Sequence, residues 1–249
     1  MPIFIHDGEN TLKRDSVKLR IITSILVPLW LVLLPAVVYA HDAFTGFEID
    51  NEGQYYGYLG LRTPVTSLRP DLELLAQLYA DTIRYSFRSE GRLLDAHANS
   101  IAPAVGLRQR FGPWNVTGFA GSQIRSKRED LVNGGTMTTE KVGAFLQGET
   151  FYWHERGSFH GIISYSTLDN FLWGRLRGKL LAFKTDGGLP IYGGWDVIGM
   201  GNKDFNAFHT GPLLEIPVGK LFFLIKAGYK YTSTFQSGAY TGLELYLPF

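Results

Sequence analysis

Three cationic side chains spaced two residues apart form the densest group of chemically active residues in the sequence. Arg175, Arg177 and Lys179 lie in the segment FLWGRLRGKLLAF, where leucine and glycine fill the alternate positions. Successive side chains of an extended strand point to opposite faces, so the three cations share one face. Three like charges at this spacing repel one another unless something neutralises them. Either carboxylates of the same chain or an external ligand must therefore meet this stripe.

Charged and aromatic residues alternate in the same way elsewhere. Lys226 and Lys230 share a strand face, as do Arg108 and Arg110. Carboxylates are available at matching positions: Glu73, Asp81, Glu149, Glu215 and Glu244. Two hypotheses stay open. In the first, the charges pair across a filled interior and hold it shut. In the second, a cationic and aromatic surface contacts a polysaccharide, through Arg175, Arg177, Lys179, Tyr56, Tyr58 and Tyr79.

The sequence contains few motifs that indicate catalysis or the binding of a metal or cofactor. Ser164 and Ser166 share a face near His160, but nucleophilic hydrolysis needs a serine, a histidine and an acid together in space. His209 is followed by Thr210, and the serine and asparagine expected in a barrel lipid A deacylase are missing. No Gly-x-Ser-x-Gly, His-Glu-x-x-His or cysteine framework occurs in the sequence. We therefore expect a protein that is not an enzyme and uses no metal or cofactor.

The last fourteen residues, QSGAYTGLELYLPF, predict the kind of element that positions these groups. Leu243, Leu245, Leu247 and Phe249 fall on one strand face, and Glu244 falls on the other. Outer-membrane β-barrels end in a similar strand with a terminal phenylalanine, which their assembly machinery reads. The alternative is an edge strand of a soluble sandwich.

The N-terminal region predicts export. Residues 21–40, IITSILVPLWLVLLPAVVYA, carry no charge and follow Lys18 and Arg20. The small-residue rule for signal-peptidase cleavage fits residues 38–40, which predicts a signal peptide over 1–40 and a barrel domain over 41–249. A membrane-spanning helix is the alternative, although two prolines interrupt the segment. Acidic residues are unusual in such a leader, so Val17 is considered as the true start.

The rest of the chain resolves into twelve strand-like segments separated by turns. Strands of about 10 residues suit a tilted barrel that crosses a bilayer. Counting back from the last strand puts the short turns 66–71, 111–114 and 154–158 in the periplasm. The polar connections 88–99 and 126–138 then lie outside, as longer loops usually do. The predicted fold is a single all-β antiparallel up-and-down transmembrane β-barrel of about 12 strands in the bacterial outer membrane. The cations face its lumen, because Arg or Lys toward lipid costs about 2–4 kcal/mol.

The amino-acid composition agrees with an exported β-barrel. The chain has no cysteine, so an exported protein of this sequence cannot rely on disulfides. A closed ring of strand hydrogen bonds would stabilise it instead. Removing residues 1–40 takes away four of the 24 basic and three of the 23 acidic side chains, which leaves the two equal. Nucleic acid is therefore excluded as a partner, because it requires a concentrated basic face.

Residues 44–125 resemble a known family. The segment FTGFEIDNEGQYYGYLGLRTPV, then a strand ending in IRYSF, and later VGLRQRFGPWNVTGFAG are similar to the BcsS family of cellulose biosynthesis proteins. Leu107 stands where that family usually has tyrosine. The resemblance implies an outer-membrane accessory of cellulose or related exopolysaccharide production and secretion.

Three functional hypotheses follow. The first is a non-catalytic barrel that assists exopolysaccharide secretion, with outer-membrane lipid, the barrel assembly machinery, polysaccharide and other cellulose-secretion components as partners. The second is a general small-solute channel, which requires an open lumen. The third is a lipid A-modifying hydrolase, which requires a serine and histidine pair at the lipid-facing rim.

Overall fold

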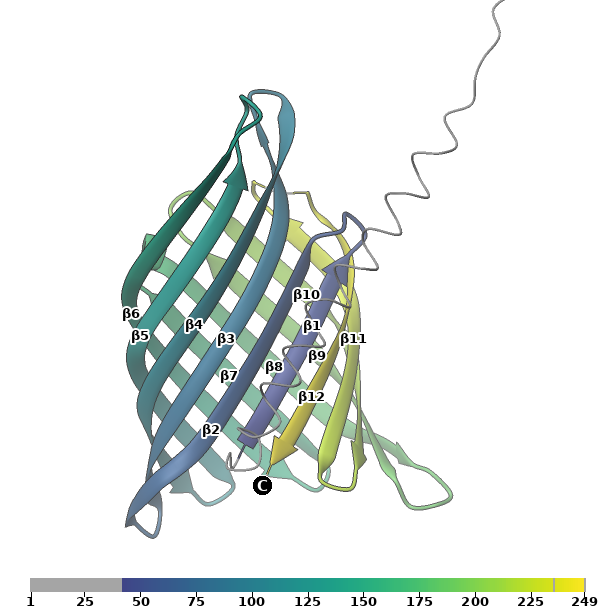
Figure 1. The fold of residues 1–249 in the computed structure, drawn as a ribbon. Helices are drawn as coiled ribbons and strands as arrows, with labels where there is room; N and C mark the ends of the chain where they lie inside the picture. The colour runs from purple at the N-terminus through teal and green to yellow at the C-terminus, as the bar shows by residue number, and fades with distance from the viewer. Residues whose placement is uncertain (1–41, 235, 249) are drawn as a thin grey trace, which may run out of the picture. The chain divides into compact units, whose positions relative to one another are not determined.

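Twelve antiparallel strands close into one barrel in the computed structural model, which describes residues 42–234 and 236–248 (Figure 1). The predicted signal peptide lies outside these described residues. Among them, no helix is long and apolar enough to span a membrane. The strands are β1 (Asp42–Asp50), β2 (Tyr55–Arg69), β3 (Leu72–Ser89), β4 (Arg92–Phe111), β5 (Trp114–Asp130), β6 (Thr136–His154), β7 (Gly157–Ser166), β8 (Phe171–Lys184), β9 (Pro190–Gly201), β10 (Asn206–Val218), β11 (Leu221–Thr232) and β12 (Gly238–Pro248). A short 3-10 helix, η1 (Leu168–Asn170), joins β7 to β8.

The alternation of apolar and polar residues produces these strands. In β12, Leu243 is exposed on the outside and Glu244 is buried in the lumen, as the two faces of one pleated strand. The same alternation in β8 leaves Leu176 56% exposed beside buried Arg175 and Arg177. Apolar side chains that are exposed on the outer wall need lipid around them, because water would make such a surface unstable. The protein is therefore an outer-membrane β-barrel, as the sequence predicted.

The first and last strands close the ring. Each strand pairs with its neighbours in the chain, and β1 pairs with β12 from Asp42 opposite Pro248 to Asp50 opposite Tyr240. Closure satisfies the backbone groups that an open sheet would leave unpaired within the bilayer. The seam between β1 and β12 thus joins segments almost 200 residues apart in sequence.

The rim where β12 ends, called here the C-terminal rim, carries tight turns. β4 and β5 are separated only by Gly112 and Pro113, and β6 and β7 only by residues 155–156. Gly112 has a φ of 57°, a backbone conformation that glycine adopts without strain. The short turns predicted at 111–114 and 154–158 are confirmed.

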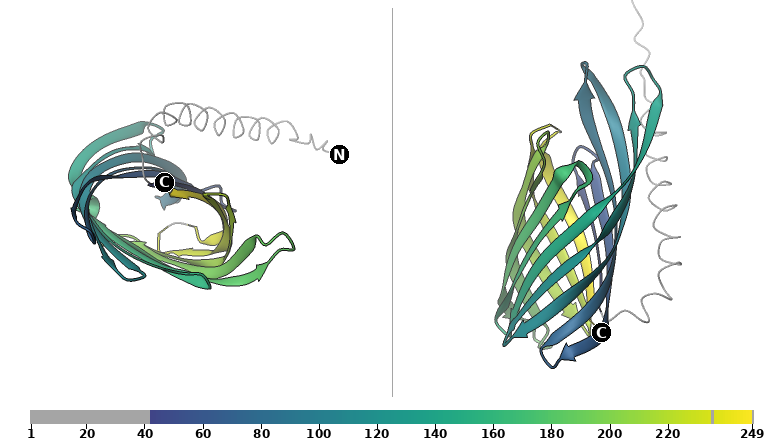
Figure 2. Two further views of the ribbon diagram at one scale, coloured as in Figure 1. Left: turned by 90° about the horizontal axis from the view of Figure 1, so that it is seen from below. Right: turned by 90° about the vertical axis from the view of Figure 1, so that its left-hand side faces the viewer.

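The opposite rim differs from the sequence prediction in one respect. The segments 88–99 and 126–138, expected as loops, are mostly strand. Ser89 pairs with Arg92, and Asp130 pairs with Thr136, so β3–β4 and β5–β6 are long hairpins. They project beyond the remaining strands (Figure 1, Figure 2). We call this projecting part, residues 85–96 and 122–144, the hairpin sheet.

The lumen has two chemically different sides. On the β3–β6 side, buried apolar residues pack together: Leu75, Ala102, Ala104, Phe119 and Phe145. Leu75 interrupts the polar alternation of its strand and belongs to this cluster. On the β8–β12 side, the buried residues include most of the lumen's charges. The candidate site lies where these two sides meet.

Candidate functional site in the lumen

The predicted cationic stripe lines the lumen. Arg175 and Arg177 are buried, Lys179 is half-buried, and the alternate residues of β8 face outward. The predicted orientation is therefore confirmed for all three cations. The structure also identifies the groups that neutralise them.

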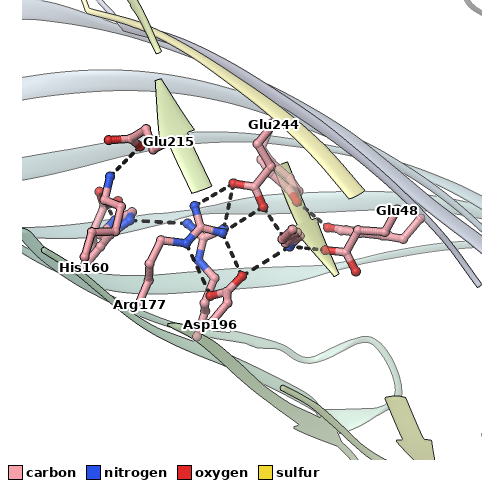
Figure 3. A network of polar contacts seen from close by, with 12 residues as sticks. Glu48, His160, Arg177, Asp196, Glu215 and Glu244 are labelled. Atoms are coloured by element: carbon pink, nitrogen blue, oxygen red, sulfur yellow. Dashed lines mark hydrogen bonds and ion pairs between the residues drawn. The ribbon is translucent and has the colours of Figure 1, made fainter. Parts of the chain in front are cut away.

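Arg177 is held by carboxylates from two other strands (Figure 3). Its Nη1 lies 2.7 Å from Oε2 of Glu244 on β12, and its Nη2 lies 2.9 Å from Oε1 of the same residue. Its Nη2 also donates to Oδ2 of Asp196 on β9 at 2.8 Å. Two bonds to one carboxylate fix the guanidinium in direction as well as position.

Lys226 on β11 links a third carboxylate, that of Glu48, to Glu244 and Asp196. Its Nζ contacts Glu48 on β1, lies 2.8 Å from Oε1 of Glu244 and lies 3.3 Å from Oδ2 of Asp196. The Lys226 side chain is 1% exposed and that of Asp196 is 0% exposed. A lysine this deeply buried requires such partners, because an unpaired ammonium in a protein interior is very costly.

We call Glu48, Arg175, Arg177, Asp196, Lys226 and Glu244 the lumen network. It contains three cations and three carboxylates drawn from five strands, and so carries no net charge. All six residues are buried, with at most 9% of their surface exposed. The charges thus pair as the first hypothesis predicted.

Two further ion pairs flank the lumen network. Lys179 Nζ lies 2.5 Å from Oε2 of Glu215. Arg62 on β2 pairs with Glu149 on β6 at 2.5 Å, and Glu149 also lies 2.9 Å from Nε2 of His160. His160 in turn contacts Arg175 through Nδ1 at 3.3 Å. Charged contacts therefore extend around the lumen wall from β2 to β12.

The three predicted tyrosines form a separate aromatic wall. Tyr58 stacks on Tyr79 with ring centroids 6.1 Å apart, and Tyr56 lies 5.7 Å from Tyr58. The hydroxyls of Tyr56 and Tyr79 are 2.5 Å apart. All three rings are half-buried although they point into the barrel, so they border internal space rather than a fully packed core.

Glycines on β1 and β2 make room for these rings. A Cβ atom at Gly46 would lie 2.6 Å from the ring of Tyr58, and one at Gly60 would lie 1.9 Å from the ring of Phe44. No real Cβ atom tolerates such contacts with an immobile ring. The rings of Tyr58 and Phe44 therefore lie directly over the backbone of Gly46 and Gly60. These glycines let both rings pack close to the barrel wall.

Several other charged and aromatic residues also point inward. Arg108 pairs with Asp42 and Glu73, and Lys230 pairs with Asp50. The ring of Tyr240 lies 5.6 Å from that of His209. These contacts are local, so the structure does not bring these residues into the lumen network.

Sequence reasoning missed three important partners. From the sequence, none of Glu48, Asp196 and Arg62 is singled out as a partner of the cations. Asp196 stands alone between small and apolar residues in PIYGGWDVIGMG, and a single charge in such a strand is a signal for a buried lumen partner. Glu48 lies between Phe47 and Ile49 in β1, but Asp42 and Asp50 at the ends of that strand make it less conspicuous.

The sequence's candidate nucleophiles are engaged differently. Ser166 donates to Gln123, which donates to Ser100, which donates to Asp81. No hydrogen bond recorded within the described chain joins Ser164 or Ser166 to His160. His209 faces the lumen, whereas Thr210 faces outward and accepts from Trp195.

One hydroxyl does contact a histidine on the outer face. Thr82 Oγ1 lies 3.0 Å from Nε2 of His97, near the base of the hairpin sheet. The nearby Asp95 is engaged by Arg84 and Ser86. No group of three or more potential metal ligands occurs among the described residues.

Comparison with known proteins identifies a family and a fold. The family described as cellulose biosynthesis protein BcsS matches residues 43–249. The β domain of the Bordetella autotransporter BrkA is similar in structure, with a TM-score of 0.50 and 9% identity, over 84% of this chain and 100% of that one. The translocator domain of the autotransporter NalP from Neisseria meningitidis has a TM-score of 0.49 and 12% identity, over 97% and 100% of the two chains. No curated protein matches the sequence. At such identities, the likeness to the BrkA domain concerns the fold alone.

Proposed function

Because the chain belongs to the BcsS family of cellulose biosynthesis proteins, we propose that it is a non-catalytic outer-membrane accessory of cellulose or related exopolysaccharide secretion. The observation that carries this proposal is the pairing of a charge-balanced network with a half-buried tyrosine wall. A neutral sugar polymer needs flat rings for stacking and hydrogen-bonding groups for its hydroxyls, without net charge. The lumen offers this combination.

The six predicted residues have two roles in this proposal. Tyr56, Tyr58 and Tyr79 supply ring faces that border internal space. Arg175, Arg177 and Lys179 supply the opposite, hydrogen-bonding wall. Among the described residues, the buried Nε of Arg175 has no hydrogen-bond partner, so the hydrogen bonds of this guanidinium are not all satisfied within the barrel.

The partners follow from the location and the family. Outer-membrane lipid surrounds the exposed leucines of the outer wall. We propose that the barrel assembly machinery reads the C-terminal strand, whose last residue, Phe249, lies outside the described residues. Other cellulose-secretion components are proposed as partners from the family alone.

A general small-solute channel fits the lumen less well. Free diffusion of solutes requires a water-filled passage, and the charged residues of the lumen network are buried and paired with one another rather than exposed along such a passage. Conductance in planar bilayers tests this alternative directly, since a plugged barrel passes no steady current.

A lipid-modifying hydrolase has one observation in its favour. The contact between Thr82 and His97 lies on the outer wall, where a lipid could reach it. Nucleophilic catalysis also needs a group that orients the histidine and a site that stabilises the oxyanion. Release of fatty acid by the wild-type barrel, abolished by His97→Ala, would establish this activity over the non-catalytic proposal.

The double substitution Arg175→Gln with Arg177→Gln tests the proposed role of the lumen. We expect less exported polymer per folded barrel, with folded barrel measured by heat-modifiable migration on gels. Arg156→Gln, in an exposed turn of the C-terminal rim, is the control.

The two lumen hypotheses give different results in this experiment. If the cations only neutralise carboxylates, the double variant loses thermal stability because the buried carboxylates of Glu244 and Asp196 then share Lys226 as their one cation within the lumen network. Unchanged polymer per folded barrel together with lost stability would remove the sugar-contacting role and leave a purely structural network.

A further inference from the structure

The lumen-facing side of β3 continues beyond the barrel. Tyr79 in the aromatic wall is followed on the same strand face by Asp81, Ile83, Tyr85 and Phe87. β2 ends its pairing with β3 at Tyr55 opposite Arg84, so Tyr85 and Phe87 lie in the hairpin sheet. At about 3.3 Å per residue, Tyr85 lies about 20 Å along the strand from Tyr79. One strand face therefore carries aromatic rings both inside the lumen and beyond its mouth.

Tyr85 and Phe87 form a small aromatic surface. Their ring centroids are 6.3 Å apart. The Nζ of Lys127 on β5 lies 5.9 Å from the centroid of Tyr85, which places a hydrogen-bond donor beside the rings. Directly opposite Tyr85 on β4 stands Ala96, which is 1% exposed and so is covered by the side chains around it. Rings bordered by polar groups of this kind are suited to a ligand with flat apolar faces and polar edges.

The charges on this face balance apart from Arg92 at the tip of the β3–β4 hairpin, which bonds the backbone oxygen of Val132. Lys127 lies 2.6 Å from Glu129. Asp169 of η1 lies 2.7 Å from Lys141 and 3.5 Å from Arg125. With Asp81 on β3, three cations meet three carboxylates below the tip of the hairpin sheet. A polyanion requires an excess of positive charge, so this face favours a neutral ligand.

We propose that the lumen-facing side of the hairpin sheet binds a segment of a neutral glucan chain. Tyr85 and Phe87 stack on its sugar rings, while Lys127 and Glu129 hydrogen-bond its hydroxyls. The inference rests on the proposed function for the polymer class, and it adds a second binding surface in line with Tyr79. Charge balance argues against an acidic polymer, and continuity with the aromatic wall argues for the same ligand at both places.

The test uses the purified full barrel in detergent micelles and isothermal titration calorimetry with cellohexaose. The variant is Tyr85→Ala with Phe87→Ala. Leu93→Ala is the matched control, because Leu93 is 55% exposed on the opposite face of the same hairpin. Tyr85→Trp keeps a ring at the site, and heat-modifiable migration checks folding of every variant. We expect binding at least tenfold weaker in the double variant, unchanged binding in the control, and binding near the wild-type level for Tyr85→Trp.

Several results would overturn the inference. These are no binding of cellohexaose to the wild-type barrel, equal binding by the double variant, or tighter binding of an oligogalacturonate than of cellohexaose. Sedimentation tests an alternative role. If the wild-type barrel is a dimer, the double variant is a monomer and both bind the sugar equally, the two rings mediate contact between two copies of the barrel instead. Polymer yield per folded barrel in the lumen variant tests the proposed function separately, so failure of one is distinguishable from failure of the other.

Discussion

Replacing Lys226 with methionine should destabilise the barrel more than any comparable change at its surface. Lys226 is 1% exposed and contacts Glu48, Asp196 and Glu244. Methionine retains most of the side-chain volume but leaves three carboxylates facing two arginines. Removing one partner of a buried ion pair typically costs about 3–5 kcal/mol, because the remaining charge is left uncompensated. We expect a loss of this size in the free energy of unfolding.

Equilibrium urea unfolding in lipid vesicles measures this change. The four tryptophans of residues 41–249 provide the fluorescence signal, and the shift in midpoint at constant slope gives the free-energy difference. Lys220→Met is the matched control, because Lys220 is exposed in the turn between β10 and β11. A change within about 0.5 kcal/mol is expected there, as for most surface substitutions.

A second substitution tests the physical cause. Lys226→Met with Glu48→Gln restores the charge balance of the lumen network, leaving two arginines with two carboxylates. The double variant should recover more than half of the lost stability, since it removes the unpaired charge. If Lys226→Met alone is as stable as the wild type, water must solvate these carboxylates and the lumen is not filled at this level. If the double variant is no better than the single one, lost packing rather than charge is responsible.

Two other predictions concern orientation and assembly. Because the sequence has no cysteine, single-cysteine labelling is unambiguous: Asn133→Cys should react with an impermeant reagent on whole cells and Arg156→Cys should not, whereas the reverse pattern would invert the proposed topology. Deleting Phe249 should lower the yield of heat-modifiable barrel and expose the chain to periplasmic proteases, and normal yield after the deletion would contradict a role for this residue in assembly.

Local sequence pattern predicted much of the fold and the direction of the site residues. Period-two alternation in β8 is sufficient to place Arg175 and Arg177 inside and Leu176 outside, because the pleat allows only two directions. The hairpin sheet was not foreseen. Its strands lack a continuous apolar outer face, so a segment such as SKRED in β5 has the composition of a loop.

The pairings inside the lumen depend on information that no single segment contains. Arg177 meets Glu244 from four strands away, and this contact depends on the stagger of all the strands between them. In a closed barrel, strand number, tilt and stagger are linked, so the partner of an inward charge is a property of the whole ring. The sequence therefore predicts which residues face inward without predicting which of them meet.

The lumen network also has a consequence for how the barrel forms. Lys226 on β11 contacts Glu48 on β1 and Glu244 on β12, which lie on the two sides of the seam. Until β1 meets β12, Glu48 lacks this partner and the remaining charges are out of balance by one. The contact between Lys226 and Glu48 therefore forms only in the completed ring, whereas Arg177 and Asp196, directly opposite each other on β8 and β9, pair without it. Pairing of β1 with β12 therefore also completes the neutralisation of the lumen charges. A folding intermediate in which this seam is still open is less stable, because it carries one uncompensated charge.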